Sequence, residues 1–316
     1  MEKIGENIPV LAQDHYWGEI QKDEMEKLLG LIEAEGFSVF KQKLFAENHG
    51  LYDFIFDEVR SDWRFCLPVA KDWRVLDLGA GLGANAFSLA KETMEVVAVE
   101  RSFLRARFLE MRKNAEDQNN LSIIAADALS LPFDGASFDL VIANGLFEWL
   151  GVTDKFASPP EAQAHFLKEV LRILKPGGFL YVGIENRFAA TYLFKGVDHS
   201  GLKYTSWLPR FLANAYTRWR TGQNYRTYTY SRAGYEKMFR QAGFNNIQTY
   251  LLLPGYNVPR YIIEHDDLAG LKFMTRQVFG GMSFKKRILK KIIGLPLVAR
   301  LWRWLFFSFG VFGQKI

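Results

Sequence analysis

The 316-residue sequence contains one cysteine, Cys66, which excludes an internal disulfide and any cysteine-based metal cluster. No basic segment followed by an apolar core stands at the N-terminal end, so we expect no secretory leader. No internal repeat or low-complexity tract is present. No histidine–carboxylate pair stands at the spacing of a metal site, and we therefore expect no metal.

The composition is that of a globular protein with extra apolar surface. Hydrophobic residues make up 49% of the chain and charged residues 24%, which is enough apolar material for a sizeable core. Aromatic residues reach 15%, more than a minimal core needs. The net charge is +5, and the basic excess is concentrated near the C-terminal end. The length fits one large domain or a domain with additions.

The stretch 75–100 has the pattern of a nucleoside-binding half-fold. An apolar run at 75–78 predicts a buried strand, and a second run at 96–99 ends in the carboxylate of Glu100. Between them, Gly79, Gly81 and Gly83 stand at alternate positions before a helical run. Such glycines allow a sharp turn and a close ligand approach, with the acid at the ribose hydroxyls.

The residues around the glycines favour one nucleoside ligand over the others. No Lys-Ser/Thr follows the glycines, which argues against a phosphate-binding P-loop. Ala84 stands where the dinucleotide-binding motif has Gly or Ala, so a dinucleotide ligand is not excluded by the glycines alone. Asp77 stands two residues before Gly79, where a carboxylate can meet a cationic amino-acid group but would oppose a pyrophosphate. The resulting Asp-x-Gly-x-Gly-x-Gly motif resembles that of the class I S-adenosylmethionine (SAM)-dependent methyltransferases.

Further polar residues follow the next predicted strands. The strand at 121–125 leads into Asp127, and the strand at 138–143 leads into Asn144. The carboxyl ends of parallel strands meet at one rim of an open sheet, which is where ligands bind. The resemblance implies that Asp127 meets the adenine amino group. The predicted cofactor-binding residues are Asp77, Gly79, Ala80, Gly81, Gly83, Asn85, Glu100, Arg101, Asp127, Ala128, Asn144 and Gly145.

The second half of the domain separates methyltransferases from dehydrogenases. Lys-Pro-Gly-Gly at 175–178 stands before an apolar strand, a combination that class I methyltransferases carry and dehydrogenases usually lack. The resemblance spans residues 73–184. It implies an α/β, Rossmann-like fold with a mostly parallel seven-stranded sheet and helices on both faces. We expect the runs 247–253 and 260–264 to form an antiparallel pair at the sheet edge.

The pattern divides the chain into segments. Helical spacing predicts a cap over residues 1–70, with helices at 23–37, 39–47 and 51–60. Residues 71–265 form the expected methyltransferase domain, 185–230 an acceptor-binding lid inserted after the fifth strand, and 266–316 a basic and aromatic extension.

The sequence of residues 185–264 resembles that of a narrower group, the methyltransferases of bacterial cell-surface polysaccharide and lipopolysaccharide synthesis. The strings are Ile-Glu-Asn-Arg-Phe, Asp-His-Ser-Gly-Leu, Leu-Pro-Arg-Phe-Leu-Ala-Asn and Tyr-Arg-Thr-Tyr-Thr-Tyr-Ser. This resemblance implies O-methylation of a sugar or sugar-linked group, including one on a lipid carrier. The predicted substrate-binding residues are Glu185, Asn186, Arg187, Tyr225, Arg226 and Tyr228.

A hydroxyl acceptor benefits from a base within hydrogen-bond reach. His199 is the first candidate, because it is the insertion's only histidine and histidine titrates near neutrality. Glu148 is the second candidate. Alternatively, His199 belongs to a simple turn and Glu148 faces a helix N-terminus. His165, among apolar helical neighbours, reads as structural.

The last stretch, 283–316, places a basic cluster at 285–291 before aromatic and aliphatic residues. Pro296 and two arginines make it a poor membrane span. Basic residues beside Trp and Phe predict a helix lying on an anionic membrane surface, which would make the protein peripheral on the inner face of the cytoplasmic membrane. The alternative is a helix docked on its own domain or on a second subunit, which leaves a homodimer open.

Three functions remain open. The first is SAM-dependent O-methylation of a surface glycan or lipid-linked sugar, and the second is methylation of a quinone or other lipid acceptor. The third belongs to another class, a catalytically silent SAM-fold subunit that binds or regulates a partner, although the intact Asp77, Glu100 and Asp127 speak against it. We expect no nucleic acid, because the basic residues cluster with apolar ones at one end.

Overall fold

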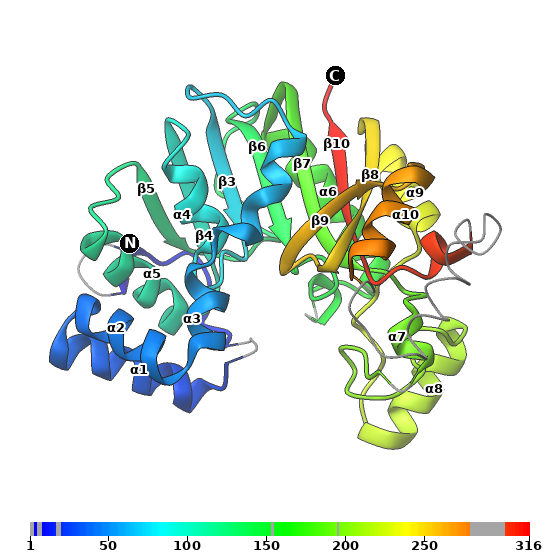
Figure 1. The fold of residues 1–316 in the computed structure, drawn as a ribbon, viewed down its shortest axis with the longest axis horizontal. Coiled ribbons are helices and arrows are strands. Elements are labelled where there is room, and N and C mark those ends of the chain that lie inside the picture. The colour runs from blue at the N-terminus through cyan, green and yellow to red at the C-terminus, as the bar shows by residue number, and fades with distance from the viewer. Residues whose placement is uncertain (1–2, 5–7, 17–19, 153–154, 195, 279–300) are drawn as a thin grey trace. The chain divides into compact units, whose positions relative to one another are not determined.

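The computed structural model describes residues 3–4, 8–16, 20–152, 155–194, 196–278 and 301–316 (Figure 1). The chain divides into two compact units. The first comprises 1–144, 169–180 and 315–316, and the second comprises 145–168 and 181–314. The described residues include no helix that is long and apolar enough to cross a membrane.

The first unit contains the parallel strands of the nucleoside-binding half. Their order is β5 (Leu121–Ala125), β4 (Glu95–Glu100), β3 (Arg74–Leu78) and β6 (Phe138–Asn144). The pairs β5–β4, β4–β3 and β3–β6 are all parallel. β3, β4 and β6 are almost wholly buried, as expected of a parallel sheet covered on both faces, whereas the edge strand β5 exposes Ser122. The predicted Rossmann-like arrangement is therefore confirmed for this half.

The sheet as a whole has eight strands, and the prediction of seven was wrong. The order continues as β7 (Leu174–Glu185), β10 (Ser308–Gln314), β8 (Asn245–Gly255) and β9 (Val258–Glu264). Both β10 and β9 pair antiparallel with β8, so the sheet is mixed. The antiparallel pair predicted at the edge is confirmed as β8 and β9.

Strand β10 corrects the interpretation of the C-terminal stretch. Residues 308–313 are buried inside the sheet, so an extension separate from the domain was wrong for them. Two glycines explain why an aromatic-rich run fits there. A Cβ on Gly310 would come 3.1 Å from the ring of Tyr181, and one on Gly313 would come 2.8 Å from the ring of Phe239. The basic cluster at 285–291 and Pro296 lie outside the described residues.

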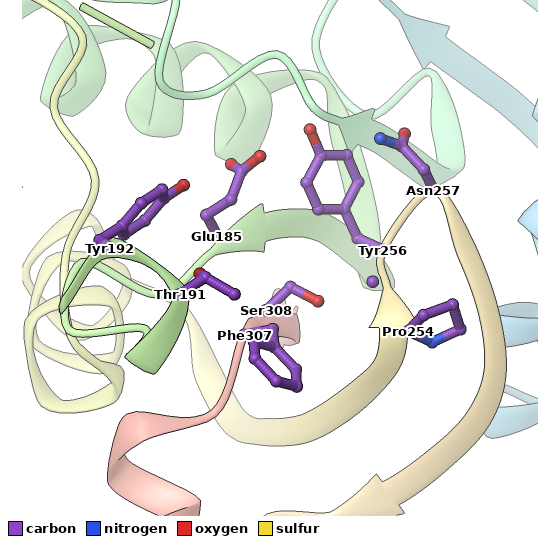
Figure 2. A pocket seen from close by; sticks show the side chains of 9 residues that line it. Glu185, Thr191, Tyr192, Pro254, Tyr256, Asn257, Phe307 and Ser308 are labelled. Atoms are coloured by element: carbon purple, nitrogen blue, oxygen red, sulfur yellow. The ribbon is translucent and has the colours of Figure 1, made fainter. Parts of the chain in front are cut away.

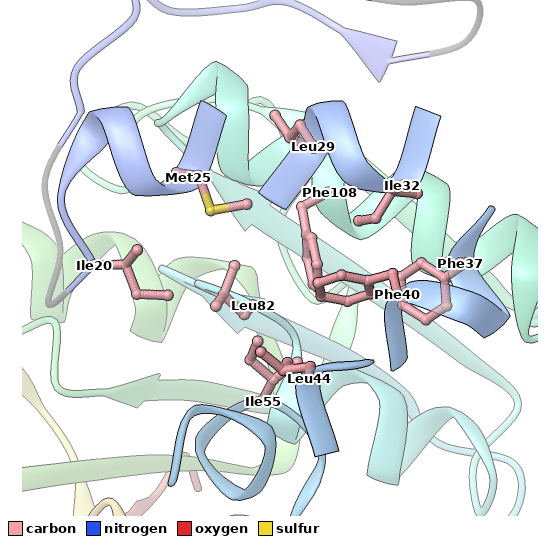
Figure 3. Packing of buried hydrophobic residues seen from close by; sticks show 10 residues of the cluster. All are labelled: Ile20, Met25, Leu29, Ile32, Phe37, Phe40, Leu44, Ile55, Leu82 and Phe108. Atoms are coloured by element: carbon pink, nitrogen blue, oxygen red, sulfur yellow. The ribbon is translucent and has the colours of Figure 1, made fainter. Parts of the chain in front are cut away.

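Helices form near the N-terminal end of the first unit, where the helical spacing predicts them. They are α1 (Lys22–Glu35), α2 (Phe37–Glu47) and α3 (His49–Phe56), followed by the 3₁₀ segment η1 (Glu58–Cys66). Their apolar faces share one core with Phe108 of α5 (Phe103–Ala115) and with Leu82 of the glycine turn (Figure 3). The cap is therefore built onto the turn that the motif predicts, within one compact unit.

Arg112 joins the cap to this turn by hydrogen bonds. Its buried guanidinium donates to the carbonyls of Ile55 in α3 and Leu82 in the turn, each at 3.1 Å. It also lies over the ring of Phe87 in α4 (Ala84–Ala90), 3.9 Å from the ring centroid. A cation buried among carbonyl oxygens and an aromatic face satisfies groups that would otherwise lack partners.

The second unit holds the insertion. Its helices are α7 (Ala190–Leu193), α8 (Arg210–Thr221), α9 (Arg232–Ala242) and α10 (Leu268–Val278), and α6 (Pro159–Ile173) begins in it. Short elements complete the described chain: β1 (Lys3–Ile4), β2 (Ile8–Pro9), η2 (Leu150–Val152) and η3 (Arg303–Leu305). The insertion carries a core of its own, in which the Arg210 guanidinium lies over the rings of Tyr225, Tyr228 and Tyr230.

Candidate active site

The glycine turn leaves open space above its backbone. Gly81 has a φ of +59°, and a Cβ built there would meet no atom closer than 3.9 Å. Gly83, with a φ of +87°, serves the protein itself, since a Cβ would come 2.6 Å from the ring of Phe87 and 2.7 Å from Leu109. Gly81 therefore keeps room for a ligand, whereas Gly83 lets α4 and α5 approach the turn.

Asp77 lies at the base of this turn as a buried acid. It is 1% exposed, and its Oδ2 has no hydrogen-bond partner among the described residues. Burial raises the pKa of Asp77 to about 7, against the lowering effects of the Ala86 backbone N–H and the Arg60 charge. Leaving a buried carboxylate oxygen unsatisfied is costly. A cationic ligand group would relieve that cost, so the residue fits the amino-acid portion of SAM.

Carboxylates end the two neighbouring strands. Glu100, at the end of β4, accepts hydrogen bonds from the backbone N–H groups of Gly81 and Ser102, each at 2.9 Å. These bonds hold its carboxylate beside the turn. Asp127, which follows β5, accepts from the backbone N–H of Leu129 at 2.9 Å, and its Oδ2 lies 3.5 Å from an Arg101 guanidinium nitrogen. The strand order therefore brings Asp77, Glu100 and Asp127 to consecutive strand ends.

The other predicted cofactor residues differ in their surroundings. Asn144 ends β6, and both polar atoms of its side-chain amide are buried without a hydrogen-bond partner among the described residues. Asn85 has a structural partner, because its Oδ1 accepts from the indole N–H of Trp63 at 3.0 Å. Ala80 and Ala128 are buried beside the turn and beside Asp127. Gly145 belongs to the second unit, where a Cβ would come 2.8 Å from the ring of Tyr256.

The two predicted catalytic residues lie together in the second unit. The imidazole Nε2 of His199 is 3.6 Å from Oε1 of Glu148 and 3.1 Å from Oε1 of Glu185. Glu148 is fully buried, and Trp149 places its ring edge-on to His199 with centroids 4.7 Å apart. The three side chains come from the segment after β6, the end of β7 and the insertion. Tertiary structure alone makes them neighbours.

The charges around His199 change the role expected for it. Burial by itself would lower its pKa, but the hydrogen bond and charge of Glu185 and the charge of Glu148 raise the pKa of His199 to about 9. At neutral pH the ring is therefore a cation. The expectation that His199 titrates near neutrality and acts as a resting base does not hold in this setting. Its neighbour Asp198 accepts from Tyr225 instead, at 3.0 Å.

Glu185 also lines a cavity of about 250 Å³ (Figure 2). Figure 2 shows its carboxylate between the rings of Tyr192 and Tyr256, with Phe307 on the floor. The remaining lining residues are Thr191, Pro254, Gly255, Asn257 and Ser308. Oε1 of Glu185 is paired with His199, whereas its Oε2 has no hydrogen-bond partner among the described residues. The cavity thus combines aromatic walls with one carboxylate oxygen that can accept a proton.

Most of the other predicted substrate residues have structural partners. The amide of Asn186 donates to the carbonyls of Trp304 and Phe306, each at 2.8 Å. The guanidinium groups of Arg187 and Arg226 also donate to backbone carbonyls, those of Ser206 and Leu208 and those of Gly151 and Phe156. Tyr225 and Tyr228 belong to the aromatic core around Arg210. Of the six residues, Glu185 is the one that lines the cavity.

Sequence reasoning missed Tyr192 and Tyr256. Tyr256 stands with Asn257 in the turn between β8 and β9, which the sequence indicates only as the connection of an antiparallel pair. The sequence also contained no sign that Glu148, Glu185 and His199 could hold a metal ion. One donor atom from each of these residues lies within 4.8 Å of the others. No local spacing could indicate that group, because its members come from three segments.

Comparison with known proteins agrees with the first unit's geometry. Residues 76–182 match the model of a methyltransferase domain family. The chain is 36% identical over 121 residues to a demethylmenaquinone methyltransferase of Clavibacter sepedonicus, covering 38% of this chain and 43% of that enzyme. It is 27% identical over 255 residues to a ubiquinone/menaquinone biosynthesis C-methyltransferase of Bartonella tribocorum, covering 75% and 88%. The chain thus spans less than half of the Clavibacter enzyme.

A solved structure is similar at the level of the chain trace. It is phosphoethanolamine N-methyltransferase 2 of Haemonchus contortus with S-adenosyl-L-methionine, at 17% identity and a TM-score of 0.49, covering 90% of this chain and 59% of that one. The narrower resemblance to polysaccharide methyltransferases is not shown by these comparisons. The residues matched by the family model include Asp77, the glycine turn, Glu100 and Asp127. Residues 76–182 therefore form a class I SAM-dependent methyltransferase domain.

Proposed function

We propose that this chain transfers the methyl group of SAM to a quinol-type aromatic acceptor held in the cavity beside Glu185. The observation that carries the proposal is a cavity lined by Tyr192, Tyr256, Phe307 and Glu185, with the imidazole of His199 3.1 Å from the Glu185 carboxylate. Flat aromatic walls suit a flat ring. The names of the two quinone-pathway relatives favour the same acceptor class over a sugar.

The residues of the second unit would manage the acceptor's proton. A phenolic hydroxyl must lose its proton before the ring becomes a strong nucleophile, and the Glu185 carboxylate, whose Oε2 has no hydrogen-bond partner among the described residues, would accept it. The His199 cation, held by Glu185 and Glu148, would stabilise the negative charge left on the acceptor oxygen. As the new bond forms, the methyl–sulfur bond would break with its electron pair left on the sulfur. At a ring carbon, the proton of that carbon would then pass to solvent and the ring would regain aromaticity; at the oxygen, no further proton leaves.

The first unit would hold the cofactor. Asp77, the glycine turn, Glu100 and Asp127 would bind the amino-acid, ribose and adenine portions in turn. SAM supplies an electrophilic methyl group on a positively charged sulfur. The O-methylation of a sugar remains the second hypothesis, and the carboxylate and imidazolium would serve a sugar hydroxyl by the same chemistry.

A labelled-methyl assay tests the proposal. The protein is incubated with methyl-labelled SAM and, separately, with a short-chain quinol, membrane lipid extracts and soluble glycans, and mass analysis locates the methyl group. We expect the label in the quinol. Label only in the glycan fraction supports the sugar hypothesis, and SAM binding without transfer to any acceptor supports the silent subunit; each contradicts the proposal.

Two variants test the roles of the residues. Glu185→Gln should lower turnover by about 10²- to 10⁴-fold without changing SAM affinity, as loss of a general base does. The exposed Glu264→Gln serves as the control and should leave turnover unchanged.

The pH profile distinguishes the two roles of His199. Because the pKa of His199 is about 9 and its cationic form is the useful one, turnover should fall as pH rises through about 9. Turnover that rises through that range would make neutral His199 the base, as the sequence first suggests.

A further inference from the structure

Helix α8 presents an apolar face to solvent within the insertion. Phe211 is 73% exposed, Trp219 is 76% exposed and Leu212 is 43% exposed. The opposite side of the same helix is buried through Ala213 and Thr217. Large aromatic side chains on an outer helical face remain in water only at a cost, and a contiguous set of them usually marks an interaction surface.

The charges on α8 indicate what covers this face. At about 100° per residue, Phe211, Trp219 and Leu212 fall on one arc of the helix, with Arg218 bordering it on one side and Arg220 on the other. The helix contains no acidic residue. An apolar arc of Trp and Phe bordered by arginines is the arrangement of a helix lying in a membrane interface, where long basic side chains reach the anionic headgroups.

The helix is held firmly behind this face. Arg210 at its first position lies over the Tyr228 ring, 4.1 Å from the centroid, and the Asn214 side chain accepts from the backbone N–H of Tyr225 at 3.1 Å. Gly222 ends the helix in the left-handed conformation. The exposed arc is thus fixed by the insertion's own core and is presented as a preformed surface.

A second short helix links the same surface chemistry to the cavity. Thr191 and Tyr192 of α7 line the cavity beside Glu185. The next two residues, Leu193 and Phe194, are 45% and 75% exposed. The insertion therefore joins cavity-lining residues to exposed apolar ones within four consecutive positions.

We propose that the α8 face docks on an anionic phospholipid bilayer, with Phe211, Leu212 and Trp219 in the interface and Arg218 and Arg220 at the headgroups. This docking does not depend on which molecule accepts the methyl group. It also moves the membrane contact, which the sequence places in the stretch 283–316, to a different part of the chain.

Vesicle sedimentation with the full chain tests the docking. We expect binding to vesicles of phosphatidylglycerol and phosphatidylcholine, weaker binding to phosphatidylcholine alone, and weakening by salt. Phe211→Ser with Trp219→Ser should lower the partition coefficient at least about tenfold, since burying each ring is worth that much or more. Arg218→Gln with Arg220→Gln should lower it about fivefold per arginine on the anionic vesicles alone.

Two controls make the outcome specific. Phe65→Ser removes an equally exposed ring, 71% accessible, from the first unit and should leave vesicle binding unchanged. A variant neutralising Lys285, Lys286 and Arg287 tests the C-terminal stretch. Undiminished binding by the Phe211/Trp219 variant overturns the proposal, whatever the C-terminal variant does. So does absence of wild-type binding together with a concentration-dependent dimer that this variant abolishes, which would make α8 a contact between copies.

Discussion

Asp77→Asn should stabilise the protein without cofactor while weakening its hold on SAM. The carboxyl group is buried, has one oxygen without a hydrogen-bond partner among the described residues, and carries a pKa of about 7 in place of the ordinary 3.8. Folding therefore disfavours its ionised form. The amide of Asn has nearly the same shape and no charge, so it removes that penalty and keeps the packing.

The size of the effect follows from the two pKa values. Below about pH 4 the carboxyl is protonated in both states and costs nothing. As pH rises from about 4 to about 7 its ionisation in the unfolded state lowers the free energy of unfolding progressively, and above about pH 7 the full penalty applies. A tenfold change in a protonation equilibrium is worth about 1.4 kcal/mol. Asp77→Asn should thus raise the free energy of unfolding by about 4 kcal/mol at pH 8 and by about 1.5 kcal/mol at pH 5.

Urea unfolding at the two pH values measures the change, and titration calorimetry measures SAM affinity. We expect at least about tenfold weaker SAM binding in the variant at pH 8, because an amide cannot balance a cationic ligand group. Asp23→Asn, on an exposed acid, is the control and should change neither quantity. A variant that is less stable than wild type at pH 8, or whose gain is the same at both pH values, would refute the reasoning.

Two further predictions concern packing around the turn and the cavity. Arg112→Met should lower the free energy of unfolding by about 3 kcal/mol, because it leaves two buried carbonyls without their charged donor. The control Arg107→Met, on the surface, should cost under about 0.5 kcal/mol, and equal losses of the two variants in urea unfolding would contradict this. Gly145→Ala should lower acceptor turnover more than about tenfold by displacing Tyr256. Gly177→Ala is also at positive φ, but its added Cβ would meet no atom within 4 Å, so it should cost stability alone; matching turnover in the two variants would contradict this.

The cofactor half of the protein was predictable because its signals are local. Asp77 and the glycines lie within a few positions of one another, and mainly apolar strands lead directly to Glu100 and Asp127. Parallel strands that follow one another in this order bring their ends to one rim, so the residue order alone indicates the site. The helices over 1–70 were predicted for the same reason, since their apolar spacing is a local property.

The acceptor half was not predictable in this way. Glu148, Glu185 and His199 come from three segments, and the two carboxylates turn an ordinary histidine into a cation. Arg187 and Arg226 look like ligand-binding residues in the sequence, but their guanidinium groups satisfy backbone carbonyls of the insertion. Sequence shows that a charged group is present; only the fold shows which partner satisfies it.

The C-terminal strand β10 is encoded less clearly than the strands of the cofactor half. Residues 308–314 have an aromatic, glycine-containing composition that suits a membrane interface as well as a sheet interior, and nothing local separates the two. The sequence by itself determined a nucleoside-binding methyltransferase half, because that half is encoded by neighbours in the chain. The tertiary structure decided the position of β10, the ionisation of His199 and the wall of the cavity, because burial and charge there depend on residues distant in the sequence.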